Sequence, residues 1–283
     1  MPDVVHRVSA PGSTANLGPG FDVLGLALAL RAEVGSGPAP SDAHLLDDHH
    51  PATIAHRRAG GAAIPLWGRS RLPMGRGLGY SGAARAAGAM LAFVEADGPH
   101  AAHDDAIRTR AFEVAAELEG HPDNAAASIF GGLVIASPTP QVTKVPIGCD
   151  AAVVVWIPET TTSTDHSRTQ LARTIERVDA VANIAAVANL IVGCMTGDQT
   201  ALRVGCNDRL HQPTRLAAVP ASAEALNAML EHGALSAWLS GSGPTVAAFA
   251  SRSSADEIAA SLDGGIVRVL DIDTTGVAVD VEL

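Results

Sequence analysis

Lysine is nearly absent from this chain, in which Lys144 is the single lysine among 283 residues. A Walker phosphate loop ends in Gly-Lys-Ser/Thr, so that class of nucleotide site is excluded. The formal net charge is −11. A nucleic acid or an anionic membrane binds a positively charged protein surface, so we expect neither as a partner of this acidic chain. An anionic substrate must therefore be held by local positive charge, a metal or helix N-termini.

Cysteines and aromatic residues are also scarce. The cysteines Cys149, Cys194 and Cys206 form no Cys-x-x-Cys pair, which argues against a disulfide framework or a zinc site. Aromatic residues make up 3% of the chain, so Ala, Val, Leu and Ile must fill the core. We expect no signal peptide and no apolar run approaching the length of a membrane span. These features predict a soluble, cytoplasmic protein.

The order of predicted elements favours an α+β fold with two domains. Strands are predicted at 4–10, 23–34, 131–137, 152–156, 266–270 and 277–283, with a strand–turn–strand at 235–249. Helices are predicted at 52–58, 81–95, 102–118, 180–196, 222–232 and 255–262. The absence of a repeated strand–helix rhythm argues against a doubly wound sheet. We place the domains at 1–148 and 149–283.

The segment 75–84 combines a glycine loop with the start of an alanine-rich helix pattern. Its glycines allow the backbone to approach an anion and to adopt positive φ. The following helix offers unpaired N–H groups and the positive end of its dipole. A dinucleotide fingerprint fits poorly because the glycines are spaced Gly-x-Gly-x-Gly, and a flexible loop is the simpler alternative. The predicted phosphate-binding residues are Gly75, Arg76, Gly77, Leu78, Gly79, Tyr80, Ser81 and Gly82.

Four further segments carry motifs that we interpret together with the glycine loop. They are Thr14-Ala-Asn-Leu-Gly-Pro-Gly-Phe-Asp-Val-Leu-Gly25, Glu119-Gly-His-Pro-Asp-Asn124, Asp208-Arg-Leu-His-Gln-Pro-Thr-Arg215 and Leu239-Ser-Gly-Ser-Gly-Pro-Thr245. Together the segments resemble the homoserine kinases of the GHMP small-molecule kinase superfamily. The resemblance implies a ribosomal-S5-like N-terminal domain, a ferredoxin-like C-terminal domain and an active site between them. It also implies transfer of the γ-phosphoryl group of MgATP to the side-chain hydroxyl of L-homoserine, on the route to threonine.

The resemblance assigns the magnesium site to Ser81 and Glu113. Ser81 is similar to the family serine that reaches the metal and a phosphate, and a helix N-cap is its alternative role. Glu113 stands 11 positions before Asn124, the offset of the superfamily's magnesium carboxylate. A solvated helix glutamate is its alternative, which Glu117 and Glu119 share. Magnesium prefers oxygen ligands and retains several waters, so few protein ligands suffice.

Asn124 stands where related sugar and mevalonate kinases carry a catalytic aspartate. Because an amide cannot accept a proton, the resemblance implies that the hydroxyl proton passes to the γ-phosphate or to solvent. Asn124 and Asn16 would then orient the nucleophile. Asp123 is the alternative base, although we expect it to cap the helical segment that follows.

An amino-acid substrate brings a carboxylate and an ammonium group, and each needs a partner. Arg168 and Arg215 resemble the family's carboxylate-binding arginines, since a guanidinium makes two parallel bonds to a carboxylate. Surface ion pairs are the alternative for both arginines. Asp22 is expected to face the ammonium group. The other predicted substrate contacts are Asn16, His121, Asn124 and Thr164.

Two features depart from the family pattern. Tyr80 replaces the first serine of a Ser-Ser pair, and its phenol either narrows the phosphate pocket or points outward. The segment 34–72, which helps to enclose adenine in these kinases, is short, so ATP rests on the resemblance alone. The alternatives are a superfamily kinase for another small alcohol or hydroxy acid and a nucleotide-binding relative without turnover. Family members are often dimers, so a homodimer is consistent with the resemblance.

Overall fold

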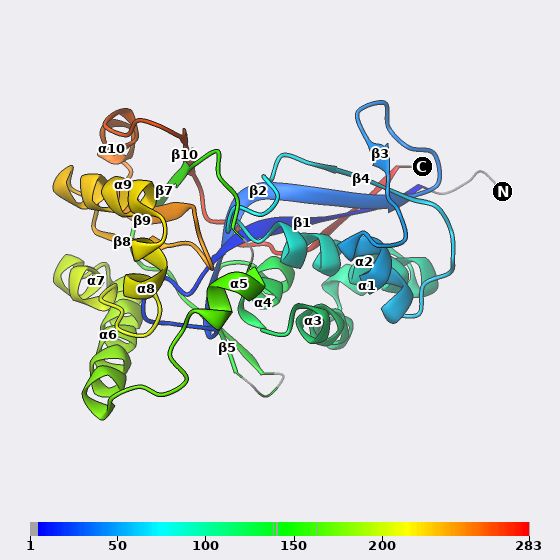
Figure 1. The fold of residues 1–283 in the computed structure, drawn as a ribbon. Helices are drawn as coiled ribbons and strands as arrows, with labels where there is room; N and C mark the ends of the chain where they lie inside the picture. The colour runs from blue at the N-terminus through cyan, green and yellow to red at the C-terminus, as the bar shows by residue number, and fades with distance from the viewer. Residues whose placement is uncertain (1–4, 138, 140, 163, 283) are drawn as a thin grey trace.

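The computed structural model describes residues 5–137, 139, 141–162 and 164–282. Its first sheet contains β1 (Val5–Ala15), β2 (Leu24–Ser36), β3 (His44–Leu45), β4 (Leu66–Ser70), β5 (Leu133–Ala136), β6 (Val142–Val145) and β11 (Ala278–Glu282). The seven strands are antiparallel in the order β11-β1-β2-β4-β3, with β5 paired to β2 and β6 paired to β5. The long strands β1 and β2 form the centre of this sheet (Figure 1).

Helices from the first half of the chain cover one face of this sheet (Figure 1). They are α1 (Pro51–Arg58), α2 (Tyr80–Asp97), the 3₁₀ helix η1 (Pro99–His103), α3 (Asp105–Glu119) and α4 (Asp123–Phe130). Small residues let α2 pack closely on its neighbours. A Cβ on Gly88 would lie 2.2 Å from the carbonyl oxygen of Ala52, so glycine is required where α2 meets α1.

The second sheet is antiparallel and lies beside the first. It contains β7 (Ala151–Ile157), β8 (Ser236–Leu239), β9 (Val246–Ser251) and β10 (Ile266–Leu270), in the order β10-β7-β9-β8. The helices α9 (Pro220–Glu231) and α10 (Ala255–Ala260) pack on it over a separate apolar cluster. The remaining helices of this half are α5 (Thr164–Thr169), α6 (Arg177–Thr196), α7 (Gln199–Gly205) and α8 (Gln212–Ala217).

The first strand is longer than predicted. It was expected to end at residue 10, but β1 continues to Ala15 after a bulge between Pro11 and Gly12. The polar side chains of this extension find partners inside the protein: Ser13 Oγ donates to Asn124 Oδ1, and Thr14 Oγ1 accepts from Trp238 Nε1. The polar loop therefore occupies 16–23 rather than 11–22, and the extension carries it toward the second sheet.

The terminal strand falls within the predicted second domain, 149–283, but it belongs to the first sheet. β11 pairs with β1, from Val5 opposite Glu282 to Ser9 opposite Ala278. Before it, Leu28 of β2 bridges to Ile272. The chain thus returns to the first sheet. The boundary near residue 148 falls between β6 and β7 and stays a prediction.

One helix contradicts the expectation that no apolar run approaches membrane length. α6 is long and apolar enough for a membrane span. Its mean hydropathy over 18 residues is 1.8, and 28% of that stretch is buried inside the protein. The inner face of α6 packs inside the protein, where Leu190 and Cys194 are part of the main apolar core. The buried Asn183 Nδ2 donates to the carbonyl of Pro19 and to Asp208. The outer face of α6 is solvent-exposed.

Candidate active site

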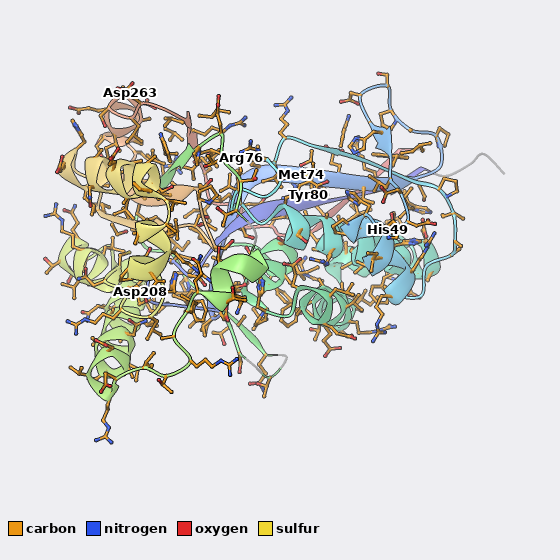
Figure 2. The ribbon with its side chains drawn as sticks, viewed as in Figure 1. His49, Met74, Arg76, Tyr80, Asp208 and Asp263 are labelled. Atoms are coloured by element: carbon orange, nitrogen blue, oxygen red, sulfur yellow. The ribbon has the colours of Figure 1, made fainter. Side chains whose placement is uncertain are left out.

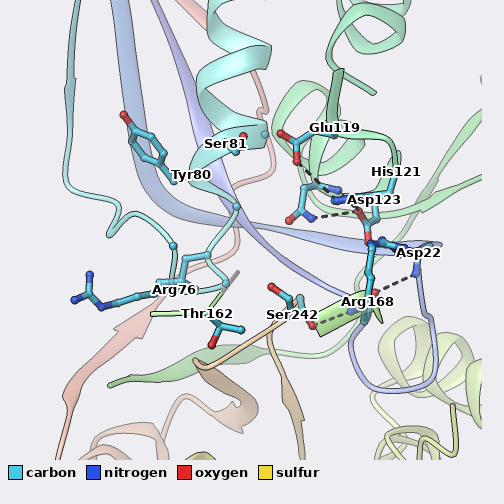
Figure 3. A pocket seen from close by; sticks show the side chains of 18 of the residues that line it. Asp22, Arg76, Tyr80, Ser81, Glu119, His121, Asp123, Thr162, Arg168 and Ser242 are labelled. Atoms are coloured by element: carbon cyan, nitrogen blue, oxygen red, sulfur yellow. Dashed lines mark hydrogen bonds and ion pairs between the residues drawn. The ribbon is translucent and has the colours of Figure 1, made fainter. Parts of the chain in front are cut away.

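A cleft of about 140 Å³ lies between the glycine loop, the 16–23 loop and the turn between β8 and β9. Most predicted site residues line it (Figure 3). They are Asn16, Asp22, Gly75, Arg76, Gly77, Leu78, Gly79, Tyr80, Ser81, Gly82, His121, Asn124, Arg168 and Arg215. The side chain of Thr164 lies outside the described residues, although α5 begins at this position. Glu113 does not line the cleft.

The glycine loop has the backbone that its sequence predicts. Gly75, Gly77 and Gly79 adopt φ values of 66°, 77° and 65°. A Cβ on Gly77 would lie 2.4 Å from the carbonyl oxygen of Ser240, and one on Gly79 would lie 2.1 Å from Ser13 Oγ. Gly79 is the N-cap of α2, and no side chain caps this end. The first N–H groups of α2 therefore remain available to an anion.

Arg76 lies in the loop, but its guanidinium does not face the cleft interior. Its Nε and Nη2 donate to the carbonyls of Pro158 and Glu159, at 3.0 and 2.8 Å. Figure 3 shows the side chain running away from Ser81. Arg76 was predicted either to bind phosphate or to be a solvated surface arginine, and in this structure its guanidinium donates to these two carbonyls instead. Arg76 ties the glycine loop to the end of β7, at the junction of the two sheets (Figure 2).

Tyr80 points outward rather than into the phosphate end of the cleft. Its hydroxyl hydrogen-bonds His50 Nε2 at 2.9 Å, and the two rings meet edge to face. His50 in turn caps α1, where its Nδ1 accepts from the backbone of Ala52. Burial raises the pKa of Tyr80 and lowers the pKa of His50, so both groups are neutral near pH 7. Of the two alternatives for Tyr80, the outward one is correct.

Ser81 and Glu119 meet through one arginine. Ser81 is the second residue of α2 and not its N-cap, so the capping alternative is wrong. Arg85, one helical turn later, donates to Ser81 Oγ and pairs with the Glu119 carboxylate. The Glu119 side chain is only 8% exposed, and burial lowers the pKa of Arg85. A hydroxyl and a carboxylate thus converge on one positive charge beside the glycine loop.

Glu113 is exposed and lies in an adjoining groove whose lining includes neither Ser81 nor the glycine loop. The reason is the phase of α3. Glu119 follows Glu113 by six positions, which places the two side chains about 120° apart around a helix of 3.6 residues per turn. Glu119, and not Glu113, therefore lies in the cleft beside Ser81 and the glycine loop.

The segment after α3 forms a hydrogen-bonded group at the cleft wall. Asp123 is almost fully buried and accepts from His121 Nδ1 at 2.9 Å and from the backbone of Asn124 at 2.7 Å. The N-cap of α4 is Pro122, so the expected capping role of Asp123 is wrong. Asn124 Oδ1 accepts from Ser13, and its Nδ2 donates to Asp123 at 3.2 Å. Asp123 fixes the ring of His121 and the amide of Asn124.

Asn16 holds the opposite wall together. It is buried with a φ of 70°, its Nδ2 donates to the carbonyl of Gly241, and its Oδ1 accepts from the backbone of Asp22. An amide nitrogen carries two hydrogens, so Asn16 and Asn124 each keep one donor for a ligand. Asn16 therefore connects the 16–23 loop, which carries Asp22, to the turn between β8 and β9.

The other end of the cleft concentrates positive charge around Phe21. The guanidinium carbons of Arg168 and Arg215 lie 5.5 and 5.3 Å from the centre of its ring. Arg168 donates to both carboxylate oxygens of Asp22, at 2.9 and 2.5 Å (Figure 3). Burial first, and then the charge of Arg168, lower the pKa of Arg215. The charges of Asp22, Asp208 and Asp123 partly offset this lowering of the Arg215 pKa. Two neighbouring guanidinium groups suit an anionic ligand such as a carboxylate.

Arg215 is oriented by its own motif. The motif's Asp208, which lies among the helices of the second half (Figure 2), accepts from the backbones of His211 and Gln212 at the start of α8. His211 Nε2 donates to the carbonyl of Gly18 at 2.8 Å, so its Nδ1 accepts from Arg215 Nη1 at 3.2 Å. Arg215 Nε has no partner among the described residues. A neutral His211 is required for this arrangement.

Stability should therefore depend on pH through His211. Burial lowers the pKa of His211 below its ordinary value, so the folded protein keeps the ring neutral. Below about pH 6.5 the unfolded chain binds a proton that the folded chain does not, and the free energy of unfolding should fall as the pH decreases. Urea unfolding of His211→Gln at pH 7.5, 6.5 and 5.5 should show a smaller fall than the unsubstituted protein. His49→Gln changes an exposed histidine and is the control; equal pH slopes in all three proteins would contradict this role.

Comparison with known proteins identifies the family. Two parts of the chain match GHMP kinases: residues 49–132 match the N-terminal domain of that family, and residues 190–265 match its C-terminal region. A homoserine kinase of Thermus thermophilus is 39% identical over 86% of each chain. One of Streptomyces avermitilis is 35% identical over 96% of this chain and 95% of its own.

Solved structures agree with this result. The crystal structure of homoserine kinase from Cytophaga hutchinsonii matches with a TM-score of 0.83 at 25% identity, covering 99% of this chain and 98% of the other. Mevalonate kinase of Methanococcus jannaschii, at 12% identity and a TM-score of 0.66 over 95% and 98% of the chains, shares the fold. The expected α+β GHMP kinase fold is confirmed. The chain belongs to the homoserine kinase family of the GHMP kinases.

Proposed function

We propose that this protein transfers the γ-phosphoryl group of ATP to the side-chain hydroxyl of L-homoserine, giving O-phospho-L-homoserine. The observation that carries the proposal is the cleft itself. The same cleft is lined by both ends of the site. One end has the glycine loop and the uncapped N-terminus of α2, and the other end has two guanidinium groups beside a carboxylate. The first end suits a polyphosphate and the second suits an amino acid, because each offers charges opposite to those of its ligand.

The glycine loop binds phosphate through its backbone in this proposal. Gly79 illustrates the constraint, since any side chain there meets Ser13 and takes up an unfavourable φ. Positive φ costs an L-residue about 1–2 kcal/mol. Gly75 has the same sign of φ, but a Cβ there would meet only Thr161 at 3.7 Å, an ordinary contact. Comparing an alanine at these two positions therefore distinguishes the effect of backbone strain from the effect of a steric collision.

Gly79→Ala should weaken ATP binding far more than Gly75→Ala. Both substitutions carry the strain of positive φ, but only the first forces the α2 N-terminus away from Ser13 and Asn124. Isothermal titration with ATP measures the affinities, and urea unfolding reports whether each variant stays folded. Equal losses of affinity in the two folded variants would show that the collision at residue 79 does not shape the phosphate site.

The residues of the cleft fit a magnesium ion. Ser81 Oγ and the Glu119 carboxylate are oxygen donors, and both already meet the positive charge of Arg85. Magnesium bound there would neutralise charge on the phosphates and keep several waters as further ligands. In the protein itself, Glu119 would supply the negative charge and Ser81 a neutral oxygen. Arg85 must move from at least one of these groups when a metal enters.

Positioning carries most of the chemistry in this mechanism. Asn16 and Asn124 each have one free amide hydrogen for the substrate oxygen, and both amides are fixed by protein hydrogen bonds. A loose phosphoryl-transfer transition state needs little early deprotonation of the nucleophile. The proton then passes to the transferred phosphoryl group or to solvent. The Asp123 carboxylate already accepts from His121 and Asn124, which favours an orienting role over that of base.

The amino-acid end of the substrate exchanges partners with the protein. Before binding, Asp22 and Arg168 neutralise each other across the loop. A substrate ammonium group can take the place of Arg168 beside Asp22, which releases Arg168 to join Arg215 on the substrate carboxylate. Each charge then keeps a partner of opposite sign, so binding leaves no isolated charge in the cleft. Phe21 supports both guanidinium groups through this exchange.

The remaining assignments follow from the family. We place the enzyme in the cytoplasm, with small-molecule substrates and without a nucleic-acid or membrane partner. The acidic net charge of −11 is consistent with both exclusions. A homodimer is the proposed assembly.

A substrate panel tests the function directly. ADP release with magnesium should be measured for homoserine, threonine, serine, mevalonate and pantoate. Saturable turnover on homoserine alone supports the proposal. Turnover on mevalonate or pantoate instead would assign another small alcohol, and tight ATP binding without turnover on any of them would mark a nucleotide-binding relative.

A further inference from the structure

The outer face of α6 carries an apolar stripe that nothing in the described part of the chain covers. Val178, Val181, Ile184, Val192 and Met195 are 65%, 59%, 70%, 50% and 47% exposed. Ala185 and Ala188, between them, are exposed as well. No charged residue occurs from 180 to 197. Such a long exposed apolar surface is unusual for a monomer and marks an interaction site.

The spacing of the stripe is that of a two-helix seam. Its central positions are 178, 181, 185, 188, 192 and 195, which alternate steps of three and four residues. This is the spacing of the a and d positions in a coiled coil, where each side chain fits between those of a facing helix. The opposite face of α6 already packs in the core. The stripe therefore faces outward with a pattern suited to one further helix.

A second copy of α6 fits this stripe in the antiparallel direction. If the twofold axis passes between residues 186 and 187, Val178 faces Met195, Val181 faces Val192, and Ala185 faces Ala188 of the other copy. Every central position of the seam then meets an apolar one, while Ile184, beside the seam, lies level with Asn189. The pairing is reciprocal, as an isologous interface requires. The two alanine layers lie at the axis, where small side chains let the helices approach closely.

Charges at the two ends of α6 support the same arrangement. Arg177 is exposed at the N-terminus of its own helix, where the helix dipole disfavours a cation. In the antiparallel pair it lies level with Thr196 and near Asp198 of the second copy, at a helix C-terminus that favours a cation. The symmetry repeats this contact at the other end. A parallel pair would instead bring the two Arg177 side chains together.

Resting on the homodimer proposed above, we propose that its two copies meet through the outer face of α6 in this antiparallel register. A lipid bilayer is the rival occupant, since α6 has the length and composition of a membrane span. Spanning would require the buried Asn183, with its hydrogen bonds to Pro19 and Asp208, to leave the core. Unsatisfied polar groups in hydrocarbon are costly, so the structure favours the second copy.

Sedimentation velocity over a range of protein concentrations tests the proposal. The unsubstituted chain should sediment as a dimer of the 28.8 kDa protomer. Val181→Glu should weaken the dimer about 100-fold or more, because each copy then buries an unpaired carboxylate against Val192. Leu45→Glu is the matched control, since it adds the same charge at a 72% exposed site in β3 and should leave the dimer intact.

A double substitution tests the register itself. V181E/V192K places opposite charges at facing positions and should restore the dimer, whereas V181E/V192E should not. Circular dichroism and urea unfolding establish that each variant is folded. A monomer for the unsubstituted chain, a dimer that survives Val181→Glu, or a failure of V181E/V192K to re-form it would each overturn the proposal. So would co-flotation of the unsubstituted protein with vesicles of phosphatidylcholine and phosphatidylglycerol.

Discussion

Arg215→Ala is expected to raise the KM for homoserine by at least about 30-fold while changing the KM for ATP little. The guanidinium of Arg215 is buried, stacks on Phe21 and faces the second arginine of the cleft. Truncating one member of a desolvated, hydrogen-bonded charge pair costs about 2–5 kcal/mol, which corresponds to about 30-fold or more in affinity. Steady-state kinetics with each substrate varied in turn measures the two effects separately.

The same motif supplies the control for this experiment. Arg209 lies six residues earlier, its side chain is 55% exposed, and it pairs with Asp179 on the surface. Exposed ion pairs contribute little, so Arg209→Ala should leave both KM values unchanged. Arg215→Lys keeps a charge but loses the planar fork, and it should recover only part of the affinity. A parallel rise in both KM values for Arg215→Ala would place Arg215 outside the carboxylate site.

Glu119→Gln is expected to lower kcat/KM by about 100-fold or more and to weaken Mn²⁺ binding. The carboxylate of Glu119 is enclosed beside Ser81, and a bound cation is worth several kcal/mol of transition-state stabilisation in phosphoryl transfer. Titration of Mn²⁺, followed by electron paramagnetic resonance in the presence of ATP, gives the affinity independently of turnover. The amide of glutamine keeps the size of the side chain, so the change isolates the charge.

Glu113→Gln is the matched control on the same helix. Its carboxylate is exposed and belongs to the adjoining groove, so turnover and Mn²⁺ affinity should both be unchanged. The opposite result, with Glu113→Gln impaired and Glu119→Gln normal, would restore the assignment that chain spacing suggests. Normal Mn²⁺ binding in both variants would move the metal carboxylate away from α3.

The long regular elements were predictable because their signals are local. The alanine-rich run of α2 ends at Gly98, and α6 ends at Gly197, which is in the left-handed conformation favoured at helix C-termini. Strand β10 occupies the predicted residues 266–270. The short helices α7 and α8 were not predicted, because tertiary packing rather than propensity sets so few turns. The strands β3, β4 and β6 were missed for a similar reason.

The candidate site was predicted where motif residues meet through backbone geometry. The glycine loop and the arginines of two distant motifs do line one cleft. Glu113 was misplaced because an offset along the chain does not fix the face of a helix, and the helical phase of 113 and 119 could have separated them. Ser13 was missed because β1 is longer than its apolar pattern suggests. Phe21 carried a signal, as an aromatic beside Asp22 in a chain with few aromatics.

Arg85 also carried a signal, as one long basic side chain inside a run of alanine and glycine. Its contacts with Ser81 and Glu119 give the enzyme a resident counter-ion. A guanidinium stays protonated across the physiological range and is anchored one turn away, so it can swing aside but cannot diffuse off. In the proposed magnesium site, the apparent metal affinity would therefore be the outcome of a competition between a tethered monovalent cation and a free divalent one. Nucleotide phosphates, which attract the displaced arginine as well as the metal, should tilt that competition toward exchange.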